Sequence, residues 1–298
     1  MSSPSELIVK TKHFNPAALS YLPAKVNTRG GKSVQMRLQG QPLVLAIPLM
    51  FTWGVNERVD ETSGRVSYDL NLVFENEKSS AIASFCDKLK EMQEKILTDA
   101  SSGKSKEWFG KSKLSKEVAE AMMYPILKYP KDKTSGELDY TRNPTVKVKI
   151  PYWEGKFNLE LFDMKANPIF MPEKDGVESP QGDKSVVDIV PSKSHIKGLI
   201  SCTGLWMAGG RFGVTWKLVQ AQVREPVRLT GTGVCHLMAD SDDDELLDNE
   251  EEKEESVPQM SSALADTDEE EQEEEEKEEP KPKKKKVVRR KKTKKADA

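Results

Sequence analysis

The amino-acid sequence predicts a mainly β protein, a small closed or partly open β-barrel with an inserted α-helical segment. Three observations predict it. Apolar and polar residues alternate along several short segments between residues 33 and 224, and this period of two is typical of half-buried strands. Residues 79–98 instead place apolar residues three or four apart, as an amphipathic helix does. After residue 238, charged residues dominate, and such a composition buries too little apolar surface to fold.

The first strands are predicted at residues 33–39, 42–55 and 65–75, after an N-terminal arm at 1–30 with room for one short strand. Alternate positions are apolar in the second and third of these segments, so we expect one face of each strand to point inward. Pro48 lies inside the second strand, where a proline indicates an edge or a bulge. The residues expected to point inward are Leu43, Leu45, Ile47, Leu49, Phe51 and Trp53, followed by Val66, Tyr68, Leu70, Leu72 and Phe74.

A helical insertion is predicted at about residues 77–125. Its long helix spans 79–98, with Ser79 or Ser80 as the N-cap, and a shorter helix spans 115–123. The apolar face of the long helix consists of Ile82, Phe85, Leu89, Met92 and Ile96.

Further strands follow the insertion and complete a domain that we place at residues 31–238. Residues 171–185 contain proline, glycine and charge, and are predicted to form a loop. The predicted strands are 144–152, 156–163, 185–190, 197–207 and 211–224. Seven to nine short strands with one long helix between them favour the barrel over other β architectures.

Charge is distributed very unevenly along the chain. The formal net charge is −3, but residues 1–238 carry about +7, residues 239–279 carry −20 and residues 280–298 carry +10. We interpret the second zone as a disordered acidic tract and the third as a disordered basic tail. Zones of opposite sign on one chain indicate nucleic acid or charged proteins as partners.

The basic tail contains the sequence PKPKKKKVVRRKKTKK. This pattern is typical of a nuclear localisation signal and also of a nonspecific DNA-binding arm, and the two interpretations are compatible. The residues assigned to the localisation signal are Lys283, Lys284, Lys285, Lys286, Arg289 and Arg290.

Several other classes of protein are disfavoured. The cysteines Cys86, Cys202 and Cys235 are few, odd in number and unclustered, which fits a reducing compartment better than a disulfide scaffold. No run of 18 apolar residues occurs, so no membrane span is expected. The N-terminus lacks the basic-then-apolar pattern of a secretory signal, so secretion is not expected.

Signatures of catalysis are also missing. The three histidines do not recur at metal-ligand spacing, and neither a Walker phosphate loop nor a Gly-x-Ser-x-Gly motif occurs. We therefore expect a protein that is not an enzyme and that uses no metal or cofactor.

The segment CTGLWMAGGRFGVTWKLVQAQVRE, residues 202–225, predicts a hairpin. Gly209 and Gly210 can both adopt the positive φ that a tight hairpin turn needs. Trp216 shares a face with Val214 and Leu218, so we expect it in the core. Near the turn, we expect Trp206, Arg211 and Phe212 to contact a ligand. For the rings of Trp206 and Phe212, a place in the core is the alternative.

Lys147 and Lys149 lie in TVKVKIP, where the apolar residues point one way and both lysines the other. A polyanion would relieve the repulsion between these lysines, although a solvated strand face also explains them. Residues 104–113 and 128–133 repeat the mixture of cations and rings. Such a mixture suits single-stranded nucleic acid, because phosphates meet the cations while bases stack on the rings. The further candidate residues are Trp108, Lys128, Tyr152, Trp153 and Lys217.

The hairpin sequence GLWMAGGRFGVTWKLVQAQV resembles the closing strands of the single-stranded DNA-binding proteins of nucleocytoplasmic large DNA viruses. These proteins are similar to the replication single-stranded DNA-binding protein of short-tailed phages. The resemblance covers roughly residues 30–230 and is most specific at 198–223. It implies an OB-fold with a helical insertion between strands, and an acidic tail. One departure is that a basic block here follows the acidic tract, so the way the phage tail docks does not carry over in detail.

Together these features predict sequence-tolerant binding of single-stranded DNA in viral DNA replication, recombination or repair. The acidic tract would modulate DNA binding or recruit replication proteins. The sequence is compatible with a homodimer but does not determine the oligomeric state. The expected location is the host nucleus or a cytoplasmic viral replication site. The alternative is a nuclear histone chaperone or another acidic-tail interaction protein, which a barrel, an acidic tract and an import signal would also suit.

Overall fold

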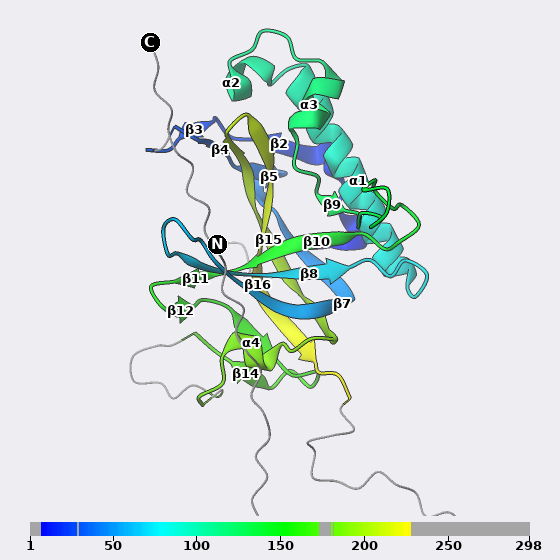
Figure 1. The fold of residues 1–298 in the computed structure, drawn as a ribbon, viewed down its shortest axis with the longest axis vertical. Helices are drawn as coiled ribbons and strands as arrows, with labels where there is room; N and C mark the ends of the chain where they lie inside the picture. The colour runs from blue at the N-terminus through cyan, green and yellow to red at the C-terminus, as the bar shows by residue number, and fades with distance from the viewer. Residues whose placement is uncertain (1–6, 29, 173–179, 181, 228–298) are drawn as a thin grey trace, which may run out of the picture. The chain divides into compact units, whose positions relative to one another are not determined.

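The structure is a computed structural model that describes residues 7–28, 30–172, 180 and 182–227 (Figure 1). The acidic tract, the basic tail and the nuclear localisation residues lie outside the described residues, as does most of the loop predicted at 171–185. The helices are α1 (Ser80–Ser101), α2 (Ser105–Phe109), α3 (Lys116–Met122) and α4 (Val186–Ile189), with short 3-10 turns at Thr11–His13 and Pro16–Ala18. The strands are β1 (Ile8–Lys10), β2 (Leu19–Tyr21), β3 (Lys25–Val26), β4 (Lys32–Val34), β5 (Met36–Leu38), β6 (Gln41–Pro42), β7 (Val44–Val59), β8 (Val66–Val73), β9 (Leu127–Lys128), β10 (Thr145–Ile150), β11 (Tyr152–Trp153), β12 (Lys156–Phe157), β13 (Glu160–Phe162), β14 (Pro168–Phe170), β15 (Ser194–Ala208) and β16 (Arg211–Arg224).

Five of the described strands close into a barrel, which confirms the predicted fold class. β7 pairs with β8 and β8 with β10, both antiparallel, and β10 pairs with β16 in parallel. β15 then pairs antiparallel with both β16 and β7, which completes the ring. The long strands β15 and β16 run beside each other through most of this barrel (Figure 1). Closure satisfies the edges of all five strands, the usual solution for a small antiparallel sheet.

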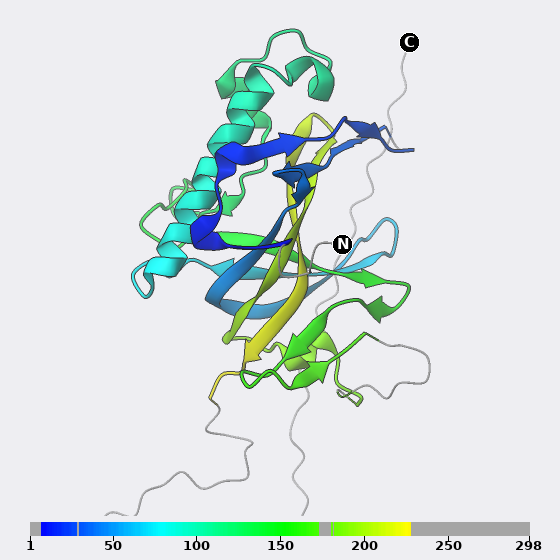
Figure 2. The same ribbon diagram turned by 180° about the vertical axis from the view of Figure 1, so that it is seen from behind.

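The N-terminal segment forms more structure than the one short strand that the sequence suggested. β1 pairs in parallel with β7, β2 pairs with β5, and β3 pairs with β4. Phe14, between β1 and β2, is buried in the core. Figure 2 shows this segment in blue crossing the helix α1, which the 3-10 turns of the same segment contact.

The helical insertion follows the sequence pattern closely. α1 begins directly after Ser79, and all five residues of its predicted apolar face are buried. The ring of Phe85 packs on Phe74, which directly follows β8, with ring centroids 5.3 Å apart. α3 begins after Ser115, whose hydroxyl accepts a hydrogen bond from the Val118 amide at 3.3 Å, a common N-cap arrangement.

Pro48 indicated an edge or a bulge, and the structure contains a bulge, which corrects the predicted facing of β7. The pairing of β7 with β15 shifts opposite this proline, between Ile196 and Gly198. Leu43, Leu45 and Ile47 point inward as predicted, but beyond the bulge the buried residues are Met50 and Thr52. Leu49 and Phe51 are only half-buried, and Trp53 is 60% exposed. A single-residue shift in register moves every later side chain to the opposite face.

The strand predicted at residues 185–190 is wrong, because these residues form the short helix α4. Ser185 and Asp188 make a capping box, in which the Ser185 amide donates to the Asp188 carboxylate at 2.9 Å. The apolar residues Val186 and Ile189, which suggested a strand, are buried by this helix. A short apolar run does not by itself distinguish a strand from a buried helical turn.

Within the described part of the chain, no helix combines the length and the apolar character that a membrane span requires. The same residues contain no group of three or more side chains placed to hold a metal ion.

Candidate nucleic-acid interface

The hairpin between β15 and β16 has the predicted turn. Ala208 pairs with Arg211, and the two residues between them, Gly209 and Gly210, have φ of +58° and +73°. Positive φ at both central residues is the requirement of a type I′ turn, which glycine meets without strain. Arg211 is exposed beside the turn, and Trp216 is 2% exposed in the core, both as predicted.

Trp206 is half-buried and lies over a glycine of the neighbouring strand. It pairs with Gly213 across the hairpin, and a Cβ atom at that glycine would stand 3.1 Å from the indole ring. Tyr124, from the insertion, flanks the same indole at 6.4 Å between ring centroids. Because Gly213 leaves room for the ring, Trp206 is held at the surface rather than in the core.

Two aromatic candidates are wrong as ligand contacts, because both are buried: Phe212 under the insertion, and Trp108 within the insertion itself. Phe212 is completely buried, with its ring 5.1 Å from that of Phe109 and its carbonyl accepting from the Tyr124 amide at 2.7 Å. Trp108, expected in an open basic loop, lies in the helix α2, is 1% exposed and packs on Tyr21 at 4.9 Å.

The lysines of β10 face outward, as the alternation predicted. Val146, Val148 and Ile150 are buried, whereas Lys147 is half-buried and Lys149 is exposed. In the parallel pairing of β10 with β16, Lys149 lies opposite Lys217. Residues directly opposite on neighbouring strands share a face of the sheet, so the closed barrel brings together cations that are far apart in the sequence.

A buried carboxylate neutralises one of these lysines. Asp69 of β8 accepts hydrogen bonds from Arg58 Nε at 2.8 Å and forms an ion pair with Lys147 Nζ at 2.7 Å. Lys149 forms no ion pair with any described residue. The unpaired positive charge on this face therefore lies at Lys149 and its cationic neighbours rather than at Lys147.

The environment of Lys149 disfavours its charged form. Although its side chain reaches solvent, partial desolvation, followed by repulsion from Lys147 and Arg65, lowers the pKa of the ammonium below its ordinary value. An anion placed beside Lys149 would reverse this effect, because opposite charge stabilises the protonated form.

Two cavities of about 210 and 390 Å³ adjoin on this face, and both are lined by Lys149 and Thr215. We call the two together the outer groove. The first also contains Tyr124, Lys128, Lys147 and Trp206, and the second also contains Arg65, Tyr68, Tyr152 and Lys217.

Rings stand at both ends of the outer groove. At one end, the Lys128 ammonium lies 4.5 Å from the centroid of the Tyr124 ring. At the other end, Tyr68, Tyr152 and Phe157 form a cluster with centroids 4.8 Å apart. Beside this cluster, the Arg65 guanidinium lies 5.9 Å from the ring of Trp153, which is 66% exposed.

Most of the predicted site residues therefore meet on one face, and the structure adds three to them. Lys128, Lys147, Lys149, Tyr152, Trp206 and Lys217 line the outer groove, and Trp153 stands beside it. Arg65, Tyr68 and Tyr124 are the additions. Tyr68 was assigned to the core by its alternation, and no sequence pattern marked the other two.

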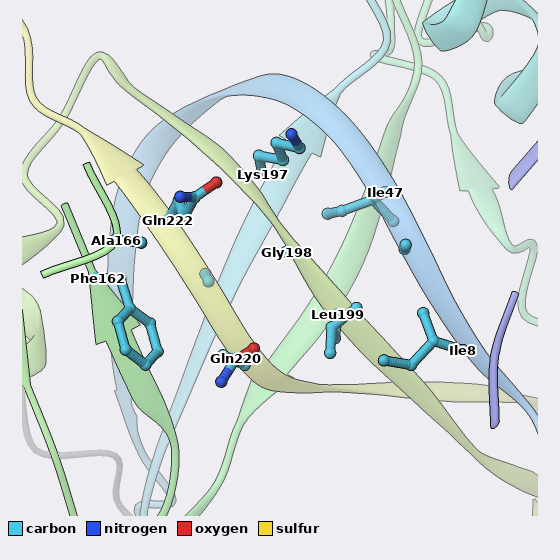
Figure 3. Close-up of a pocket in the computed structure, with 11 residues that line it drawn as sticks. Ile8, Ile47, Phe162, Ala166, Lys197, Gly198, Leu199, Gln220 and Gln222 are labelled. Atoms are coloured by element: carbon cyan, nitrogen blue, oxygen red, sulfur yellow. The ribbon is translucent and has the colours of Figure 1, made fainter. Parts of the chain in front are cut away.

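A third cavity, of about 410 Å³, lies elsewhere on the barrel and lacks this chemistry. It is lined mainly by aliphatic and amide side chains, including Ile8 and Ile47 and, from β15 and β16, Leu199, Gln220 and Gln222 (Figure 3). Lys197 is its one charged lining residue and Phe162 its one ring. None of the predicted site residues lines it.

The fold and the groove define a β-barrel protein with a cationic, ring-flanked surface. No protein-family model matches the chain, and no curated protein matches it. Among solved structures, the chain is similar to the single-stranded DNA-binding protein from bacteriophage Enc34 in complex with ssDNA, at 12% identity, with a TM-score of 0.37 over 71% of this chain and 99% of that one. It is also similar to gp2.5, a single-stranded DNA-binding protein encoded by bacteriophage T7, at 12% identity, with a TM-score of 0.29 over 75% of this chain and 100% of that one.

Proposed function

We propose that the protein binds single-stranded DNA in the outer groove, with little dependence on base sequence. The observation that carries the proposal is the pairing of Lys149 with Lys217 on a face whose two ends present aromatic rings. Cations at the centre of the groove would hold phosphates, and the rings would accept bases. This is the combination that nonspecific single-strand binding requires.

The proposed roles of the residues follow from their exposure. Lys149, Lys217 and Arg65 would contact phosphates, while Trp206, Tyr152 and Trp153 would offer stacking faces. A base stacked on a ring contributes about 1–3 kcal/mol whatever its identity. No described helix lies in the outer groove to read base edges, which is why we propose tolerance of sequence.

A role in viral DNA replication, recombination or repair is part of the proposal, supported by the resemblance of the hairpin sequence to viral single-stranded DNA-binding proteins. We also propose that the acidic tract at 239–279 competes with DNA for the outer groove or recruits replication proteins. Its charge of −20 is opposite to that of the groove, so attraction between them is expected. Import into the host nucleus by the basic tail is proposed on its sequence alone.

A nuclear histone chaperone remains the rival. The acidic tract and the basic tail suit both functions equally. The outer groove favours DNA, because a chaperone that binds basic histones through an acidic tract has no use for a face where Lys149 and Lys217 adjoin.

Direct titration separates the two. The full chain is titrated with labelled oligo(dT), with duplex DNA and with histones over a range of salt concentrations. We expect oligo(dT) to bind more tightly than the duplex, with log affinity falling against log salt by about 0.7 per neutralised phosphate. Equal affinity for the duplex would exclude stacking, and binding of histones without oligo(dT) would establish the chaperone.

A further inference from the structure

We infer that the DNA path continues from the outer groove past Lys128 into a separate cavity, where a nucleobase stacks on Trp53. This inference rests on the proposed function and adds a base-binding position to it. The cavity has a volume of about 820 Å³ and lies between β7, β8 and the segment around Lys128.

The register of the sheet places this cavity on the same face as the outer groove. Phe51 lies opposite Val73, Val73 opposite Thr145, and Thr145 opposite Lys128. Thr145 has the same facing as Lys147 and Lys149, because alternate residues of a strand point the same way. The four residue steps from Thr145 to Lys149 span about 13 Å along β10, so the two sites are neighbours on one continuous face.

Lys128 connects the two sites directly, since it lines both the outer groove and the Trp53 cavity. Its ammonium is held over the Tyr124 ring at 4.5 Å. A phosphate at Lys128 would therefore have the outer groove on one side and the Trp53 cavity on the other.

Trp53 is placed as a stacking surface. It is 60% exposed, although it lies in the middle of the barrel strand β7. Phe51 holds it through an edge-to-face contact, with centroids 4.8 Å apart and ring planes at 87°, and His195 supports Phe51 at 5.6 Å. A large ring that is fixed by packing and still exposed gives a base a partner at little entropic cost.

The charges around this cavity suit a base better than a phosphate. Lys128 and Arg142 line it together with Glu75 and Glu77, so the two signs balance. Glu75 is further neutralised by Lys78 at 2.6 Å. Tyr129 is a third lining ring beside Phe51 and Trp53, and its centroid is 4.7 Å from that of the exposed Tyr140.

The test is the dependence of affinity on DNA length. Wild-type protein and the Trp53→Ala and Trp53→Tyr variants, all as full chains, are titrated with oligo(dT) of about 4 to 16 nucleotides, the range of site sizes for one OB-fold. We expect all three proteins to bind the shortest oligomers equally. Beyond a threshold length, wild type and Trp53→Tyr should gain affinity, whereas Trp53→Ala should fall behind by about 5- to 150-fold.

Equal affinities at every length would overturn the inference while leaving the outer groove as the binding site. Loss of oligo(dT) binding by the wild type at every length would instead remove the proposed function itself. If Trp53→Ala does not fold, Trp53→Phe provides a second measurement, because it keeps a ring on Phe51. Tryptophan fluorescence of the wild type should then show a quenching step at the threshold length that Trp53→Phe lacks, and its presence in both proteins would overturn the inference.

Discussion

Lys149 of β10 lies opposite Lys217 of β16, in a parallel pair that the closure of the barrel creates. Neighbouring strands stand about 4.8 Å apart, so the two lysine side chains leave the sheet from adjacent positions on the same face. Like charges in direct opposition destabilise a sheet, and no described carboxylate forms an ion pair with either lysine. A bound polyanion would reduce this repulsion between Lys149 and Lys217.

The double variant Lys149→Ala with Lys217→Ala is expected to weaken single-stranded DNA binding. If each lysine neutralises one phosphate, the slope of log affinity against log salt should decrease in magnitude by about 1.4. Fluorescence titration of labelled oligo(dT) at several salt concentrations measures both quantities. Lys165→Ala with Lys184→Ala removes the same charge from exposed positions that line neither part of the outer groove. Similar losses in the two double variants would show that only net charge matters.

Lys147 and Lys149 are expected to differ in their effect on stability, despite standing two residues apart. Lys147→Ala removes an ion pair to the buried Asp69, so it should lower the free energy of unfolding by about 1–3 kcal/mol. Lys149→Ala removes no ion pair with a described residue and should change it by less than about 0.5 kcal/mol. Urea unfolding of the single variants measures the difference. A larger loss for Lys149→Ala would contradict the assigned ion pairs.

The pKa of Lys149 predicts opposite effects of alkaline pH on stability and on binding. Desolvation, Lys147 and Arg65 lower this pKa in the folded protein, so the unfolded chain holds the proton to higher pH. Between the lowered and the ordinary lysine pKa, the contribution of Lys149 to stability therefore increases as pH rises, while DNA affinity falls as its charge is lost. Lys149→Arg, which stays charged, should lack the contribution of this residue to both trends. A pH dependence of oligo(dT) affinity that is the same in both proteins would exclude Lys149 as its source.

Truncation separates the proposed roles of the two terminal zones. Removing residues 239–298 should tighten single-stranded DNA binding at low salt, because the acidic tract no longer competes, and the gain should shrink as salt screens the attraction. Removing only residues 280–298 should weaken binding, because the acidic tract is left without its basic counterpart. Affinities of chains 1–238, 1–279 and 1–298 for oligo(dT) test both. Should chains 1–238 and 1–279 bind equally at low salt, the acidic tract does not compete with DNA.

The sequence by itself determined the elements whose patterns are local. The helix α1 and its buried face, the Gly209–Gly210 turn and the outward lysines of β10 all follow from neighbouring residues along one segment. The same local rules indicated an edge or a bulge at Pro48, and the structure contains the bulge. They also predicted a buried Trp216, because it shares a strand face with Leu218, which is buried as well.

Only the tertiary structure decided which of these residues share a surface. The bulge in β7 turns Trp53 outward, since an irregular pairing shifts the facing of every residue after it. The helical insertion covers Phe212, and Tyr21 of the N-terminal segment packs on Trp108, neither of which a pattern in the segments of Phe212 and Trp108 reveals. The outer groove likewise exists because β10 and β16, far apart in the sequence, pair when the barrel closes. Facing within a regular strand is set by local geometry, whereas burial and proximity depend on which distant segments pack against it.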